Sequence, residues 1–205
     1  MKILKTAVIL AILAFITLAF TMKTDASYKV GDKIEDFKLK NINGKMVFLS
    51  DYKTAKGFII IFTCNTCPYS VANEDRIVAL DVKYKTKGYP VIAINPNDPN
   101  VSKGDGFEDM KVRATEKGFT FPYLLDAKQE VFQKFGASKT PHVFIVTKST
   151  MKVEYIGAID NSSRNADAVT EKYVENALDF LLVGKTPEKI ETRAIGCSIK
   201  INKKS

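Results

Sequence analysis

The stretch GFIIIFTCNTCPY, residues 57–69, joins a continuous apolar run to a pair of cysteines. The run over residues 57–63 is rich in isoleucine and phenylalanine, which is typical of a strand that is buried on both faces of a parallel sheet. Cys64 and Cys67 follow directly, and a helical pattern of apolar residues begins after them. Because open α/β sheets place their active groups at the carboxyl ends of strands, the two cysteines stand at a position that favours chemistry.

The sequence on both sides of this stretch predicts alternating strands and helices. Residues 28–49 predict a loose lead-in and a short hairpin, with Asn43-Gly44 as its turn. Residues 96–106, rich in Pro, Asn, Asp and Gly, predict a loop. The remaining predicted strands cover residues 89–95, 121–125, 142–147 and 151–156, and the predicted helices cover residues 71–84, 107–117, 128–135 and 170–183. This order predicts an α/β fold with a mixed central sheet, flanking helices and an N-terminal hairpin extension.

The first 26 residues have the pattern of an export signal. Two lysines within residues 1–5 precede an uncharged run of sixteen residues, AVILAILAFITLAFTM, at positions 7–22. This run is shorter than the roughly 20 residues that span a bilayer, and a basic start before it is typical of a secretory signal. We expect cleavage after Ala26, with an uncleaved anchor over residues 7–22 as the alternative. Either form predicts an exported protein, in a bacterial periplasm or outside the cell, that meets a membrane only through this segment.

The composition limits the remaining classes of protein. The 205 residues include 31 Lys and Arg against 23 Asp and Glu, which gives a formal net charge of +8. Nucleic-acid binding uses clustered Arg and Lys, but here the lysines are scattered and arginines are few, so no nucleic-acid partner is expected. Three cysteines are too few for a disulfide scaffold. The sequence predicts one folded domain over residues 27–200 and a polar tail over residues 201–205.

Cys64 and Cys67 can act together as a redox pair. At the start of a helix, residues three apart share one face with Cβ atoms about 5–6 Å apart, and a disulfide needs about 3.5–4.5 Å. The gap can close because the first residue is not held by an intrahelical bond. A helix N-terminus favours the thiolate, so we expect the pKa of Cys64 to fall from about 8.5 to about 7. Cys64 is then the predicted nucleophile, and Cys67 the thiol that resolves the mixed disulfide, without a cofactor.

Several segments together resemble the thioredoxin superfamily, and more narrowly its peroxiredoxin-like redoxin branch, related to alkyl hydroperoxide reductase and thiol-specific antioxidant proteins. The resemblance is carried by FTCNTCPY (62–69), FEDM (107–110), FPYLLD (121–126), GASKTPHVF (136–144), YIGAID (155–160) and IGCSIK (195–200). It implies a thioredoxin-like fold over residues 28–200, with Thr140-Pro141 as a cis-proline turn that faces the cysteines. It also implies that Thr140 and Pro141 line the binding site for thiol or disulfide protein substrates, and that an electron donor is a second partner.

The chain departs from two patterns of this superfamily. A peroxidatic site resembles P-x-x-x-[TS]-x-x-C, but Ile60 and Cys64 stand at the proline and hydroxyl positions before Cys67. The corresponding positions before Cys64 also lack both residues, which disfavours an efficient peroxidase. Thioredoxin has a buried acid six residues before its first cysteine, where this chain has Phe58.

These observations predict an exported thiol–disulfide oxidoreductase with Cys64 and Cys67 as its catalytic residues. One alternative is a thiol-dependent peroxidase, and another is a non-catalytic, copper-binding, chaperone-like protein that would use both cysteines and His142. The two cysteines could also be purely structural, and no resident metal is expected. Cys197 is either a third redox thiol that the tail brings near the pair or a small buried apolar residue.

Overall fold

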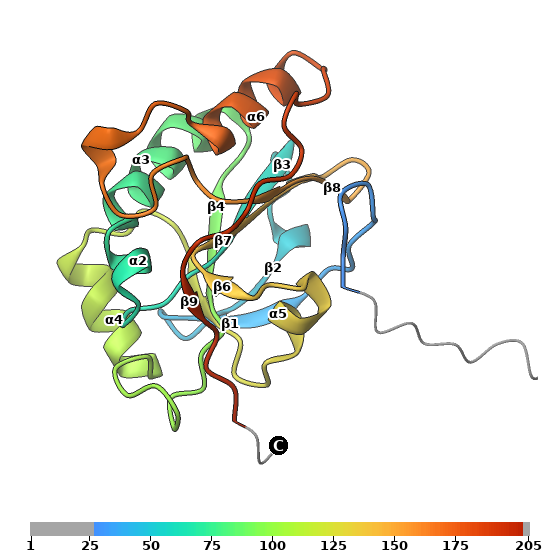
Figure 1. The fold of residues 1–205 in the computed structure, drawn as a ribbon. Coiled ribbons are helices and arrows are strands. Elements are labelled where there is room, and N and C mark those ends of the chain that lie inside the picture. Colours follow the sequence, from blue (N-terminus) through green and yellow to red (C-terminus); the bar gives the residue numbers. More distant parts are fainter. Residues whose placement is uncertain (1–26, 203–205) are drawn as a thin grey trace, which may run out of the picture.

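The computed structural model describes residues 27–202, which form an α/β fold around a seven-stranded mixed sheet (Figure 1). The strands of this sheet are β1 (Lys38–Asn41), β2 (Met46–Phe48), β3 (Gly57–Phe62), β4 (Val91–Asn95), β5 (Tyr123–Leu125), β7 (His142–Thr147) and β8 (Lys152–Gly157). The helices are α2 (Pro68–Val71), α3 (Glu74–Tyr84), α4 (Phe107–Glu116), α5 (Glu130–Phe135) and α6 (Tyr173–Leu182), with short 3-10 turns at Leu49–Asp51, Lys85–Lys87 and Ala166–Ala168. Two further strands, β6 (Lys139–Thr140) and β9 (Cys197–Ser198), pair only with each other.

The sheet has the strand order β2-β1-β5-β4-β3-β7-β8. β3 is parallel to β4 and antiparallel to β7, so the strand that leads to the cysteines lies inside the sheet with a partner on each side. The expected antiparallel pair β7–β8 is present. The N-terminal hairpin also forms, and β1 pairs with β5, so the hairpin extends the central sheet instead of standing apart from it.

Side chains of β3 alternate between two cores, one on each face of the sheet. Ile59 and Ile61 pack with Met110 of α4 and with the apolar sides of α3 and α6. Ile60 and the neighbouring phenylalanines of β3 pack on the other face, against Phe135 of α5. Figure 1 accordingly shows α3, α4 and α6 on one side of the sheet and α5 on the other. All six residues of β3 are buried, which explains its unbroken apolar sequence.

The helix that follows the cysteines is interrupted, whereas the sequence predicted one helix up to residue 84. α2 ends at Val71, and α3 starts at Glu74 after Asn73. The buried side chain of Asn73 donates hydrogen bonds to the carbonyl oxygens of Tyr69, at 2.8 Å, and Ser163, at 2.9 Å. The break therefore ties the short helix beside the cysteines to the loop that precedes α6.

The segment after α6 runs back across the sheet and returns to the cysteines (Figure 1). Its Thr192 N–H donates to the carbonyl oxygen of Ile156 at 3.0 Å, beside β8. β9 then pairs with β6 in antiparallel register, with Cys197 opposite Thr140. The N–H of Lys200 donates to Oδ1 of Asn97 at 2.9 Å. This segment was not predicted to contain a strand, and it is an integral part of the fold.

The predicted signal over residues 1–26, with its anchor alternative at residues 7–22, lies outside the described residues, as do residues 203–205 of the predicted tail. Between residues 27 and 202, no helix combines the length and the apolar character that a membrane crossing requires.

Candidate functional site

The two cysteines lie just beyond the end of β3, where the sequence placed them. Pairing with β4 continues to Thr63, whose N–H donates to the carbonyl oxygen of Ile94 at 2.9 Å. Cys64 follows, and Cys67 is the N-cap of α2, with Pro68 as the first helical residue. Pro is favourable there because its missing N–H would have no intrahelical partner. Each cysteine is only 3% exposed, and both are thiols without a disulfide.

Thr140 contacts both sulfur atoms. Its hydroxyl oxygen lies 3.3 Å from Sγ of Cys64, and its carbonyl oxygen lies 3.1 Å from Sγ of Cys67. The Thr140–Pro141 peptide bond is cis, as the resemblance implied, and Thr140 is fully buried. The structure therefore brings Cys64, Cys67 and Thr140 together. The backbone of Thr140 is paired with Cys197 of the same chain, so its binding of a substrate stays a prediction.

Cys197 completes a cluster of three thiols. Its backbone N–H lies 3.4 Å from Sγ of Cys67, and its side chain is within hydrogen-bonding reach of the same sulfur. Cys197 is partly exposed, in contrast to the buried pair. The tail therefore brings the third thiol next to the pair, which was one of the two interpretations of this residue.

Cys64 and Cys67 share one proton between them, and the directions of their pKa shifts favour the thiolate on Cys67. Hydrogen bonding from the thiol of Cys64 lowers the pKa of Cys67, and the Cys197 thiol and the backbone N–H groups of Ser70 and Cys197 lower it further, to about 4. The carbonyl oxygen of Thr140 opposes this effect, because it can accept a bond from a thiol but repels a thiolate. The several donors outweigh this single acceptor.

The other two thiols keep their protons. The hydrogen bond to Cys67 raises the pKa of Cys64, and burial and the charge of Asp105 act in the same direction. Burial and the bond to Cys67 also raise the pKa of Cys197. The expected lowering of the Cys64 pKa is thus wrong in direction. Because α2 begins only at Pro68, the N–H groups at its start act on Cys67 rather than on Cys64.

Asp105 holds the two residues between the cysteines, a role that the sequence did not reveal. Its fully buried carboxylate accepts hydrogen bonds from Asn65 N–H at 2.7 Å and from the Thr66 hydroxyl at 2.8 Å. Ser102 and Asn97 donate to it as well, at 2.6 Å and 2.8 Å. The loop over residues 96–106 was interpreted as turn chemistry only. No local signal separates Asp105 from the other turn-forming residues, because its burial results from packing against the cysteine loop.

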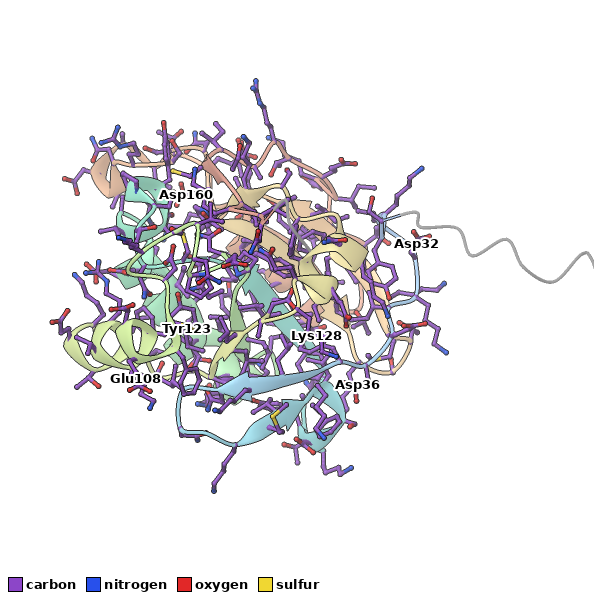
Figure 2. The ribbon with its side chains drawn as sticks, turned by 90° about the horizontal axis from the view of Figure 1, so that it is seen from below. Asp32, Asp36, Glu108, Tyr123, Lys128 and Asp160 are labelled. Carbon is purple, nitrogen blue, oxygen red and sulfur yellow. The ribbon has the colours of Figure 1, made fainter. Side chains whose placement is uncertain are left out.

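Tyr123 supports the same loop from β5. Its hydroxyl donates to Oδ1 of Asn65 at 2.9 Å, and the amide of Asn65 donates to the carbonyl oxygen of Gly104 at 2.8 Å. Burial raises the pKa of Tyr123, so the hydroxyl remains a donor. In Figure 2 Tyr123 lies inside the molecule, whereas Glu108 lies at its edge. The main chain between the cysteines is therefore fixed by both β5 and the loop before α4.

His142, the metal ligand of the copper-binding alternative, has other partners. Its Nδ1 accepts a long hydrogen bond of 3.4 Å from Ser138 N–H, and its ring centroid lies 4.7 Å from that of Phe144. Burial lowers the pKa of His142 to about 4, so the ring is neutral at ordinary pH. Among residues 27–202, no three His, Cys, Asp or Glu side chains are arranged to hold a metal ion. Within the described residues, His142 thus forms no such group with the two cysteines.

Comparisons with known proteins find a matching family and several relatives. The model of the AhpC/TSA family matches residues 30–156. Among curated proteins, the thiol-disulfide oxidoreductase ResA of Geobacillus kaustophilus is 28% identical over 155 residues, covering 72% of this chain and 82% of that protein. Among solved structures, an uncharacterized conserved protein from Geobacillus kaustophilus has a TM-score of 0.81 and 36% identity, covering 87% of this chain and 95% of that one. A solved structure from Chlorobium tepidum, described as that of a "putative Thiol:disulfide interchange protein DsbE", has a TM-score of 0.52 and 26% identity, covering 62% of this chain and 83% of that one.

Proposed function

The chain belongs to the AhpC/TSA family, and from this premise we propose that it is a thiol–disulfide oxidoreductase with Cys64 and Cys67 as its catalytic residues. The observation that carries the proposal is the contact of Thr140 with both sulfur atoms of this buried dithiol, and the lowered pKa of Cys67 adds to it because it favours a thiolate there. A thiolate is the species that attacks a disulfide. The relatives named as thiol–disulfide oxidoreductases support the same activity.

The roles of the two cysteines follow from their protonation. The thiolate of Cys67 forms the bond to an incoming sulfur, because it is ionised while Cys64 is not. Cys64 then gives up its proton and attacks Sγ of Cys67, which releases the incoming sulfur as a thiolate and leaves a Cys64–Cys67 disulfide. This assignment reverses the one that the sequence suggested. A thiol donor would restore the dithiol by the same exchange in the opposite direction.

We further propose that the protein acts outside the cytoplasm on thiol or disulfide groups of other proteins and receives electrons from a separate donor. The basic and apolar pattern of residues 1–26 supports export. Mass spectrometry of the protein isolated from its own source tests this point. We expect a mature chain that begins at Ser27, and a chain that retains residues 1–26 in a membrane fraction would instead support the anchor.

Alkylation in graded redox buffers tests the activity. The full chain should show one reversible two-electron transition in which Cys64 and Cys67 lose and regain their reactivity toward a maleimide. Neither Cys64→Ser nor Cys67→Ser should form the Cys64–Cys67 disulfide, whereas Ser50→Ala, at an exposed position of the 3-10 turn after β2, should leave the transition unchanged. A pair that never cycles, with both cysteine variants behaving like the unmodified chain, would exclude the proposal.

A thiol-dependent peroxidase remains the second candidate, because a thiolate such as that of Cys67 also reacts with peroxides. The product would be a sulfenic acid on Cys67, which Cys64 could convert to the same disulfide with loss of water. Hydrogen peroxide consumption that requires Cys67 and persists in Cys64→Ser with an added thiol would support this candidate. If the protein exchanges disulfides but does not consume hydrogen peroxide, the result would exclude the peroxidase and support the oxidoreductase.

A further inference from the structure

The catalytic pair is sealed from solvent, whereas its third neighbour is not. Cys64 and Cys67 are each 3% exposed, and Thr140, which contacts both sulfurs, is fully buried. Disulfide exchange needs a thiolate to approach a disulfide sulfur directly, so a partner cannot reach the pair in this conformation. Cys197 is the one partly exposed thiol of the cluster.

The tail holds Cys197 in this position from both sides. Before it, Gly196 allows a close approach to β6, because a Cβ there would lie 2.2 Å from the carbonyl oxygen of Thr140. After it, the carbonyl oxygen of Lys200 accepts hydrogen bonds from Asp98 N–H and from Nε2 of Gln129, each at 2.9 Å. The contact between Cys197 and Cys67 is therefore built by several independent bonds.

We propose that Cys197 is the thiol that reacts directly with the partner's disulfide, and that it relays electrons from the buried Cys64–Cys67 pair to that partner. The relay rests on the proposed function, since it needs a pair that cycles between dithiol and disulfide. Burial and the bond to Cys67 raise the pKa of Cys197, and the charges of the nearby Lys200 and Lys139 offset part of that rise.

The steps balance as three thiol–disulfide exchanges. The proton of Cys197 moves to Cys67, and the Cys197 thiolate attacks the partner disulfide, forming a mixed disulfide and releasing the first partner thiolate. That thiolate takes the proton of Cys67, and Cys67 then attacks Sγ of Cys197 and releases the second partner thiolate. This thiolate takes the proton of Cys64, which attacks Sγ of Cys67. Cys197 leaves as a thiolate and takes one proton from solvent, so the partner gains two electrons and two protons.

Disulfide mapping with bis(2-hydroxyethyl) disulfide, an uncharged probe, tests the relay on the reduced full chain. In Cys64→Ser the last step is blocked, so mass spectrometry should find a Cys67–Cys197 disulfide. In Cys197→Ser the Cys64–Cys67 disulfide should form at least about tenfold more slowly than in the unmodified chain, because the probe must reach a buried sulfur. Ile201→Ala, a change at an exposed position beyond β9, is the control and should leave the rate unchanged.

The possible failures are distinguishable. A hydroxyethyl adduct on Cys67 with Cys197 unreacted in Cys64→Ser, or an unchanged rate in Cys197→Ser, would overturn the relay and leave the proposed function intact. If the unmodified chain never forms Cys64–Cys67, the proposed function itself fails. Should Cys197→Ser not fold, Cys67→Ser decides, because that variant keeps the tail and traps the first hydroxyethyl adduct, on Cys197 if the relay holds and on Cys64 if it does not.

Discussion

The backbone N–H of Cys197 lies 3.4 Å from Sγ of Cys67, although 130 residues separate the two in the chain. The pairing of β9 with β6 creates this contact, because it sets Cys197 opposite Thr140, whose carbonyl oxygen touches the same sulfur. The ionisation of Cys67 thus depends on a distant segment as well as on its own loop. Substitutions in the tail and in the loop change these two contributions separately.

The pH dependence of the redox potential should show that the pair takes up one proton on reduction. Between about pH 6 and pH 8 the reduced pair holds a thiolate on Cys67 and a thiol on Cys64. One proton for two electrons lowers the potential by about 30 mV per pH unit, against about 59 mV for two ordinary thiols. Equilibration with glutathione buffers at several pH values measures this slope, and a slope near the larger value would contradict the thiolate.

Gly196→Ala should loosen the tail at the site. The new Cβ would lie 2.2 Å from the carbonyl oxygen of Thr140, so β9 must move away from β6, at a cost of about 1–3 kcal/mol. Cys67 then loses the donors of Cys197, and its pKa should rise. Maleimide alkylation rates against pH give that pKa, and urea unfolding gives the stability. Ile195→Ala, a change at an exposed neighbouring position, should change neither quantity.

Asp105→Asn should weaken the loop between the cysteines. The buried carboxylate accepts four short hydrogen bonds, and the Asn side chain keeps one oxygen that can still accept some of them. Because the loss of one bond to a charged group costs about 1.5–3 kcal/mol, we expect a loss of about 2–3 kcal/mol of unfolding free energy. Removal of its charge should also lower the pKa of Cys64. Asp98→Asn in the same loop is the matched control, because Asn can also accept the hydrogen bond from Asn100 N–H. Equal stability of the two variants would argue against the role of Asp105.

His142, the only histidine of the chain, should make the protein less stable at mildly acidic pH. Burial lowers its pKa from 6.5 to about 4, so below pH 6.5 the unfolded chain takes up a proton that the folded chain does not. The contribution of neutral His142 to the free energy of unfolding is therefore fully present above pH 6.5 and decreases as the pH falls toward 4. We expect the free energy of unfolding to decrease by about 2 kcal/mol between pH 7.5 and pH 5. Urea unfolding of the unmodified chain and of His142→Gln at both pH values tests this. An equal loss in both would show that the imidazole does not contribute.

The sequence predicted the parts of the fold that depend on local patterns. The apolar run of β3, the Asn43-Gly44 turn and the helix stop at Gly136 each have a local physical cause, and all three are present. The break at Asn73 was not predicted, since it depends on a hydrogen bond to Ser163, which is distant in sequence. β9 was also missed, because a two-residue strand is defined only by its partner.

The difference between local patterns and contacts of distant residues also explains which parts of the site could be predicted. Cys64, Cys67 and the Thr140–Pro141 turn were identified from spacing and resemblance, and the structure brings them together. The protonation of the pair was predicted in the wrong direction, because it depends on where α2 starts and on donors from the tail. Asp105 was missed, since a buried acid and a solvated turn residue have the same local sequence.

The length of chain between Cys67 and Cys197 also gives the relay intermediate a distinct resistance to unfolding. The Cys64–Cys67 bridge encloses only two residues and restricts the unfolded chain little. A Cys67–Cys197 bridge would close a ring that contains most of the sheet. By lowering the conformational entropy of the unfolded chain, a ring of this size raises the free energy of unfolding by about 5 kcal/mol. During each turnover the protein would pass through a form with the Cys67–Cys197 disulfide. This form would unfold at a higher temperature than the fully reduced protein or the protein with the Cys64–Cys67 disulfide.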